Sequence, residues 1–157
     1  MDSEQPHLAY CRAAARSVVK RHAITGPPVD VEAIAHAEGF AVERAPLGEL
    51  EGRMRKSSLQ WTIEVNSGRH VHAQRFTIAH ELGHHVMGHD SCGSMDLQER
   101  QANVFAAELL IPLALLRNAL KKVRRLGALS QLFFVSKEAM QYKLNEHGLL
   151  LTLSGFD

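Results

Sequence analysis

The chain has 157 residues, of which 45% are hydrophobic and 22% charged, a composition typical of one globular domain with a buried core. Its net charge of +1 argues against a surface built to coat nucleic acid. Two cysteines are too few for a disulfide scaffold and suit a reducing compartment. With no signal-peptide pattern and no apolar run of membrane-spanning length, we expect a soluble, cytoplasmic protein of one domain, 1–157.

Apolar residues alternate in the first half of the chain and elsewhere recur at helical spacing. Alternation predicts three strands of a small antiparallel sheet, at 40–44, 51–56 and 59–65. Helical spacing predicts helices at 8–21, 31–38, 73–88, 95–110, 112–122, 128–134 and 136–146. Gly127 is expected to break the chain between helices, and the apolar tail 149–153 could add a strand.

The predicted fold class is therefore α+β, with the small antiparallel sheet packed on a mostly helical domain. The last two helices, within 128–149, resemble a helix-turn-helix and are expected to pack as part of the same domain. Their apolar residues are interpreted as core packing rather than as a surface for DNA.

The predicted helix at 73–88 carries the motif H-E-x-x-H, as His80-Glu81-Leu82-Gly83-His84. Side chains four residues apart on a helix lie on one face, with β-carbons about 5–6 Å apart, so both imidazoles can bind one ion. Glu81 lies one step around the helix, where a carboxylate can act as general base on a water molecule. Because the opposite side is apolar, this segment is predicted to be a zincin-like active-site helix, with Zn²⁺ as the natural metal.

A catalytic zinc site normally has three protein ligands, so the two histidines need a third. The candidates downstream are His89, Cys92, Glu99 and Glu108. His89 does not match the metzincin spacing, and cysteine is an unusual third ligand for this motif. Glu99 borders the apolar stripe of its helix, whereas Glu108 is expected on the opposite, solvated side. Glu99 is therefore the preferred ligand.

Further residues are candidates for supporting roles. Asn103, one turn after Glu99, could hydrogen-bond the ligand shell or bridge two helices. If the third predicted strand forms an exposed sheet edge, it could align an extended substrate by strand addition, through Trp61, Ile63, Val65 and Asn66. An oxyanion donor is also required, and the candidates, each of which also fits a structural role, are His70, His72, Arg75 and Tyr142.

Two blocks of sequence closely resemble the ImmA/IrrE family of metallopeptidases. They are 74–84, which contains the H-E-x-x-H motif, and 99–112, which begins at Glu99 and includes Asn103. Shorter likenesses at 29–35, 63–66 and 135–140 extend the resemblance over most of the chain. In that family the two motif histidines and the later glutamate hold zinc, and the motif glutamate serves catalysis. The resemblance therefore implies His80, His84 and Glu99 as zinc ligands in a gluzincin-like site and Glu81 as the catalytic residue.

The resemblance also implies a function. Members of the family are bacterial and phage regulators that cleave a helix-turn-helix repressor and so release transcription. We therefore expect a zinc-dependent regulatory endopeptidase, a hydrolase of the stress response whose partner is an XRE-type repressor; Mn²⁺ could replace zinc in activity assays. Direct DNA binding and membrane binding are not expected.

Two alternatives remain open at this point. The protein could bind and sequester a repressor without cleaving it, although the intact Glu81 argues against this. It could also be a DNA-binding protein with a structural zinc, whose affinity would fall steeply with salt. The dense basic cluster of Lys121, Lys122, Arg124 and Arg125 fits a solvated helix end, with a contact to repressor or DNA as the alternative.

One residue departs from the family pattern. Relatives usually have glycine where Phe134 stands, just before Val135 and Ser136. That position commonly needs a positive φ angle, which phenylalanine tolerates poorly. The geometry of the turn between the last two helices is therefore an open question.

Overall fold

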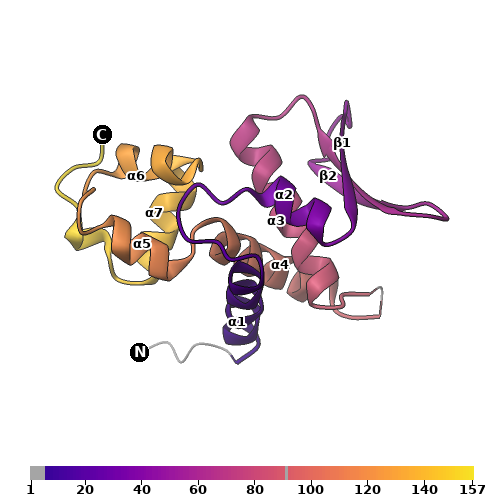
Figure 1. Cartoon of the computed structure of the whole chain (residues 1–157), viewed down its shortest axis with the longest axis horizontal. Helices are drawn as coiled ribbons and strands as arrows, with labels where there is room; N and C mark the ends of the chain where they lie inside the picture. The colour runs from indigo at the N-terminus through magenta and orange to yellow at the C-terminus, as the bar shows by residue number, and fades with distance from the viewer. Residues whose placement is uncertain (1–5, 91) are drawn as a thin grey trace.

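The computed structural model describes residues 6–90 and 92–157 (Figure 1). Its elements are α1 (Pro6–Arg21), α2 (Val31–Ala37), β1 (Phe40–Ala45), β2 (Gly52–Lys56), β3 (Trp61–Asn66), α3 (Val71–Val86), α4 (Met95–Leu110), α5 (Leu113–Ala119), α6 (Leu126–Phe133), α7 (Lys137–Glu146) and a 3-10 helix at Leu150–Thr152. The predicted α+β class is confirmed, because a small sheet accompanies a mostly helical chain. Residues 1–5 and Ser91, which belong to the predicted domain 1–157, lie outside the described part.

The three strands form one mixed sheet in the order β1-β3-β2. β2 and β3 pair antiparallel, but β1 runs parallel to β3, so the prediction of a wholly antiparallel sheet is wrong. The reason is the connection from β1 to β2, which crosses the position that β3 later fills. The buried side-chain amide of Asn66 holds this connection by donating hydrogen bonds to the carbonyls of Gly48, at 2.9 Å, and Leu50, at 2.8 Å.

The central place of β3 also overturns a prediction about the substrate. Strand addition requires a free sheet edge, whereas β3 has a neighbouring strand on each side. Ile63 and Val65 are completely buried, and the side chain of Asn66 is hydrogen-bonded to the loop before β2. A peptide therefore cannot be added beside the four residues for which this role was predicted, namely Trp61, Ile63, Val65 and Asn66.

Helices cover one face of the sheet and continue away from it (Figure 1). α2 and α3 pack near the strands, α4 lies along α3, and α1 packs on α4. The core follows this stack from Ile63 in the sheet, through Ile78 and Leu82 of α3, to Phe105 of α4, and each of these side chains is at most 1% exposed. The apolar side predicted for the motif helix is therefore buried.

Within the described residues no single helix is long and apolar enough to cross a membrane; α4 and α5, bent by 40°, reach that length and composition only together.

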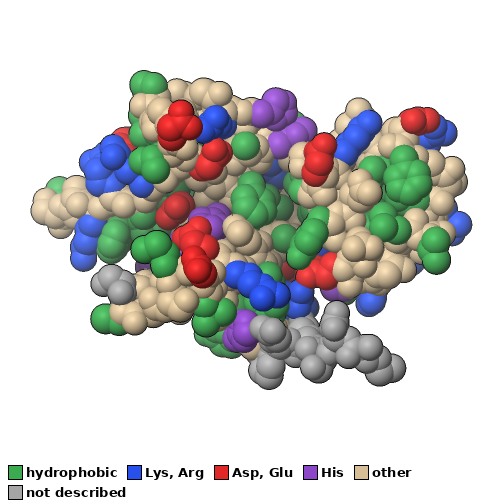
Figure 2. All heavy atoms as spheres, turned by 180° about the vertical axis from the view of Figure 1, so that it is seen from behind, with side chains coloured by type: hydrophobic (Ala, Val, Ile, Leu, Met, Phe, Trp, Pro, Cys, Tyr) green, Lys and Arg blue, Asp and Glu red, His purple; other side chains and the backbone are tan. Residues whose placement is uncertain are grey.

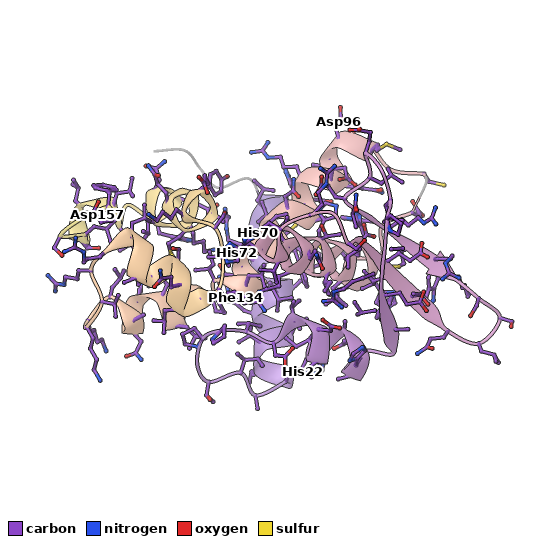
Figure 3. All side chains as sticks on the ribbon, turned by 90° about the horizontal axis from the view of Figure 1, so that it is seen from above. His22, His70, His72, Asp96, Phe134 and Asp157 are labelled. Carbon is purple, nitrogen blue, oxygen red and sulfur yellow. The ribbon has the colours of Figure 1, made fainter. Side chains whose placement is uncertain are left out.

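The C-terminal helices α5, α6 and α7 lie beside α4, away from the sheet (Figure 1). α6 and α7 form the predicted pair, and Phe134 in the turn between them is left-handed, with φ 54° and ψ 51°. This turn thus keeps the geometry that a glycine usually provides. Arg75 of α3 stabilises it, since its guanidinium lies 5.1 Å from the centroid of the Phe134 ring and its Nε donates to the Phe134 carbonyl at 3.1 Å. Figure 3 shows Phe134 beside His72, where the C-terminal helices meet α3.

Two predictions about the C-terminal region are wrong. Gly127 does not break the chain but lies buried in the first turn of α6, where a Cβ atom would be 2.6 Å from the backbone of Asp157. The tail at 149–153 forms a 3-10 helix instead of a strand. Leu126 and Gly127 donate backbone hydrogen bonds to the carbonyls of Gly155 and Asp157, so the end of the chain folds back on α6.

The carboxylate of Glu108 is not the solvated helix charge that the sequence predicts. Its side chain is completely buried and pairs with the ammonium group of Lys143 on α7, which is 1% exposed. Arg16 of α1 approaches the same carboxylate at 3.8 Å. The helical wheel correctly turns Glu108 away from Glu99, but that side of α4 faces α1 and α7 rather than water. The buried pair therefore joins the C-terminal helices to α4.

Replacing Lys143 with methionine should lower the free energy of unfolding by about 3–5 kcal/mol, because it leaves a buried carboxylate without its buried cation and with only the more distant Arg16 as a charged partner. Equilibrium unfolding in urea measures the loss, and the double variant Glu108→Leu/Lys143→Met should recover most of it. The half-exposed pair of Arg44 and Glu32, at 2.7 Å, is the control, and Arg44→Met should cost no more than about 1 kcal/mol. Equal losses at the two pairs would contradict the expectation.

Candidate metal centre

The N-cap and the buried residues of helix α3 fix the direction in which the two motif histidines point. Its first turn is capped by His70, whose Nδ1 accepts a hydrogen bond from the backbone N–H of His72 at 3.1 Å. Five residues of the helix are buried, and Ile78 and Leu82 among them lie on the side opposite the histidines; the others are Thr77, Ala79 and Gly83. The side chains of His80 and His84 are left 14% and 20% exposed, and their ring centroids are 4.7 Å apart.

Gly83 allows α4 to approach α3 beside these histidines. A Cβ atom at this position would lie 2.9 Å from Cδ1 of the buried Phe105 ring, so a side chain would push the helices apart. The two helices run antiparallel, because His80 faces Asn103 whereas His84 faces the earlier residue Glu99. The close approach therefore places Glu99 opposite the histidine pair.

Side chains of His80, His84 and Glu99 converge on one point. The two Nε2 atoms are 3.0 Å apart. Glu99 Oε1 lies 2.9 Å from Nε2 of His84, and Oε2 lies 3.1 Å from Nε2 of His80. When both imidazole nitrogens present lone pairs to each other they repel, and a cation bound between them removes this repulsion. These residues form a group that could hold a metal ion.

The donor set fits a divalent metal such as zinc. Ligand atoms bonded to tetrahedral zinc at about 2.0–2.1 Å lie about 3.3 Å from one another. The separations of 3.0, 2.9 and 3.1 Å are close to that value. Burial lowers the pKa of the His84 ring, which favours the neutral form that a metal needs. Two imidazoles and a carboxylate leave a position for water or substrate, as catalytic zinc requires.

The other nitrogen of each histidine also has a partner. Nδ1 of His80 lies 2.8 Å from Oδ1 of Asn103, the residue for which such a contact was one of two predicted roles. Nδ1 of His84 lies 2.8 Å from Nδ1 of His89, and Nε2 of His89 lies 2.9 Å from Oε1 of Gln101. Sequence reasoning considered His89 only as a ligand and missed Gln101. Gly88 was the available signal, because a glycine that ends a helix often turns the next residue back over it.

A cleft of about 1090 Å³ opens beside the three residues and is lined by His80, Glu81 and Glu99. It continues between α3 and α4 to the start of β2, at Gly52, and to α7, at Tyr142. Burial raises the pKa of the Glu81 carboxyl; the positive charge of a protonated His80 would oppose this rise, whereas the carboxylate of Glu99 adds to it. Figure 2 shows histidine, acidic and hydrophobic side chains gathered around a hollow near the middle of one face.

The remaining candidates do not belong to the group formed by His80, His84 and Glu99. Cys92 is exposed in the loop before α4, and Glu108 is buried against Lys143, so neither belongs to the group around His80. Three of the oxyanion candidates have structural contacts: His70 caps α3, His72 packs edge-on against Phe134, and Arg75 donates to the carbonyls of Phe134 and Val29. His70 and His72 also line the cleft. His72 is also two helical turns, about 12 Å, from His80. Tyr142 remains a candidate, being 62% exposed in the wall of the cleft.

Known proteins resemble this chain in sequence and in fold. The family model described as Peptidase_M78, IrrE N-terminal-like domain, matches residues 35–145, well over half of the chain. The chain belongs to the Peptidase_M78 family. The matched region contains the sheet, both helices of the metal centre and the C-terminal helix pair. The expected ImmA/IrrE relationship is confirmed.

Two proteins illustrate the extent of the likeness. The metallopeptidase ImmA of Bacillus subtilis strain 168 is 27% identical over 146 residues, covering 85% of this chain and 83% of that protein. A solved structure of a Mycobacterium tuberculosis transcriptional regulator superposes with a TM-score of 0.69 at 17% identity, which shows a shared fold. That match covers 87% of this chain but only 46% of the regulator, so this chain spans about half of its length. Membership of the Peptidase_M78 family suggests a metallopeptidase or regulator of the ImmA/IrrE type, which implies a metal ion.

Substituting Gly83 with valine should lower the free energy of unfolding by about 1–3 kcal/mol, because the added side chain overlaps the buried ring of Phe105. The same change should weaken zinc binding, measured by competition with a chelator, since displacement of α4 carries Glu99 away from the histidines. His85→Val, at an exposed position of α3, is the control for the helix cost of a β-branched residue. Identical stability and zinc affinity in the two variants would contradict the role assigned to Gly83.

Proposed function

We propose that this protein is a zinc-dependent regulatory endopeptidase. In this proposal His80, His84 and Glu99 hold the zinc ion, and Glu81 is the catalytic base. The main support for this proposal is that two imidazole nitrogens and a carboxylate converge at about 3 Å, beside a cleft lined by Glu81. When bound, zinc supplies Lewis acidity toward a carbonyl oxygen and lowers the pKa of water.

The carboxylate of Glu81 takes the proton from the attacking water and returns it to the leaving amine. A raised pKa suits this double task, because a base that titrates nearer to neutral pH both accepts and releases a proton readily. Asn103 accepts a hydrogen bond from Nδ1 of His80 and so keeps the proton away from Nε2, the nitrogen that faces the site. The buried side of α3 keeps these side chains in position when a substrate enters.

The cleft is suited to an extended peptide. The Asn66 N–H donates to the Glu51 carbonyl at 2.9 Å, and bonded and free residues alternate along an antiparallel pair. Gly52 and Met54 therefore direct backbone groups toward the free edge of β2, and Gly52 lines the cleft. We propose that this edge, rather than β3, aligns the substrate by strand addition.

For the substrate we propose a helix-turn-helix repressor of the XRE type, whose cleavage relieves repression. The support is membership of the Peptidase_M78 family and the likeness to the metallopeptidase ImmA. A role in which α6 and α7 themselves bind DNA is less well supported, because α7 has no cationic face. Its charged residues balance, and Lys143 is buried against Glu108; the others are Lys137, Glu138 and Glu146.

The test is incubation of the purified protein with a candidate XRE-type repressor from the same organism, with Zn²⁺ or Mn²⁺, followed by mass spectrometry of the products. Glu81→Gln keeps the shape of the side chain but removes the base, so cleavage should fall by about 10²–10⁴-fold. The variant should still bind one equivalent of zinc, and His84→Ala should lose both zinc and cleavage.

The same variants separate the proposal from its alternative. A protein that sequesters its repressor would relieve repression equally well with Glu81→Gln in a reporter assay, and no fragment would form. Cleavage that persists in Glu81→Gln would exclude this residue as the base. Cleavage that persists in His84→Ala after treatment with a chelator would exclude a metal-dependent reaction at this site.

A further inference from the structure

The end of helix α3 folds back on one of its own histidines. Gly88 adopts a left-handed conformation, with φ +65°, and its N–H donates to the carbonyl of His85. The next N–H, that of His89, donates to the carbonyl of His84 at 2.9 Å. These two bonds form a Schellman motif, which ends a helix and fixes the direction of the chain beyond it. The backbone itself therefore places His89 beside His84.

The side chains extend this contact into a chain of three groups. Nδ1 of His84 lies 2.8 Å from Nδ1 of His89, with the ring centroids 5.0 Å apart. Nε2 of His89 lies 2.9 Å from Oε1 of Gln101 on α4. Because His89 contacts Nδ1 of His84, it lies on the opposite edge of that ring from Nε2 and cannot reach the point where His80 and Glu99 converge. His89 is thus a partner of a ligand and not a fourth ligand.

Only one arrangement of protons along this chain leaves Nε2 of His84 free for a metal. The Gln101 oxygen accepts a hydrogen bond, so the proton of a neutral His89 lies on Nε2. Nδ1 of His89 is then an acceptor, and Nδ1 of His84 must donate to it. The single proton of His84 is used in this bond, which leaves a lone pair on its Nε2. The reverse arrangement would place a proton on that atom, where zinc must bind.

We propose that His89 and Gln101 are positioning residues that select the metal-binding tautomer of His84 and hold its ring in place. This inference rests on the proposed zinc site and assigns the two residues no contact with substrate. Each ligand histidine then has an orienting partner at its Nδ1 atom: Asn103 for His80 and His89 for His84. Asn103 and Gln101 lie on α4, and His89 directly follows α3, so the orienting groups come from the same two helices as the ligands or from the turn beyond one of them.

The test is the zinc affinity of His89→Ala, measured by competition with a chelator at constant pH. Loss of such an orienting partner typically weakens metal binding by about 10–100-fold, and we expect a change in this range. His89→Asn places an oxygen acceptor near the position of Nδ1 and should recover most of the affinity. His85→Ala is the control, since it removes an exposed imidazole from the same helix, where the ring packs on Phe40 instead of a ligand.

A second measurement reports the tautomer directly and does not depend on catalysis. In the zinc-loaded protein, ¹⁵N nuclear magnetic resonance should show the proton of His89 on Nε2, and Gln101→Leu should weaken this preference. A proton on Nδ1 of His89, or equal zinc affinities of wild type, His89→Ala and His85→Ala, would overturn the inference while leaving the zinc site intact. If the wild-type protein binds no zinc, both the proposed function and this inference are wrong.

Discussion

Close antiparallel packing of α3 on α4 is the constraint on which the rest of the structure depends. Neither helix carries a complete site: α3 has two imidazoles and α4 has one carboxylate. Gly83 has no side chain to hold the helices apart, and the ring of Phe105 lies where a Cβ atom of residue 83 would point. The antiparallel arrangement then sets the register, so that His80 meets Asn103 and His84 meets Glu99.

The remainder of the chain stabilises this helix pair from both ends. The buried ion pair of Glu108 and Lys143 joins the far side of α4 to α7, and Arg75 joins α3 to the turn at Phe134. These contacts place the C-terminal helices where they form one wall of the cleft, while the start of β2 lies at another. A pair of helices that resembles a DNA-binding unit thus lines one side of the cleft beside the metal centre, in keeping with its buried lysine.

Sequence periodicity identified the helices well, because the apolar spacing and the caps are local signals. Asp30, for example, caps α2 as predicted, and α4 has the expected bounds. The pairing of His80 with His84 also followed from spacing, since positions on one helix face are fixed by the helical repeat. Glu99 followed from its place beside the apolar stripe of α4 and from the family resemblance. Non-local features could not be found in this way. The crossover that makes β1 parallel to β3 depends on a side-chain amide at Asn66. The burial of Glu108 depends on a lysine thirty-five residues away, and the contact of His89 with His84 on a backbone turn at Gly88.

The most direct test of the account is X-ray absorption at the zinc edge of the zinc-loaded protein. We predict a first shell of nitrogen and oxygen only, at about 2.0–2.1 Å, with the multiple-scattering features of two imidazoles. A sulfur ligand near 2.3 Å would assign Cys92 to the metal. A sulfur signal, or a third imidazole, would contradict the site formed by α3 and α4.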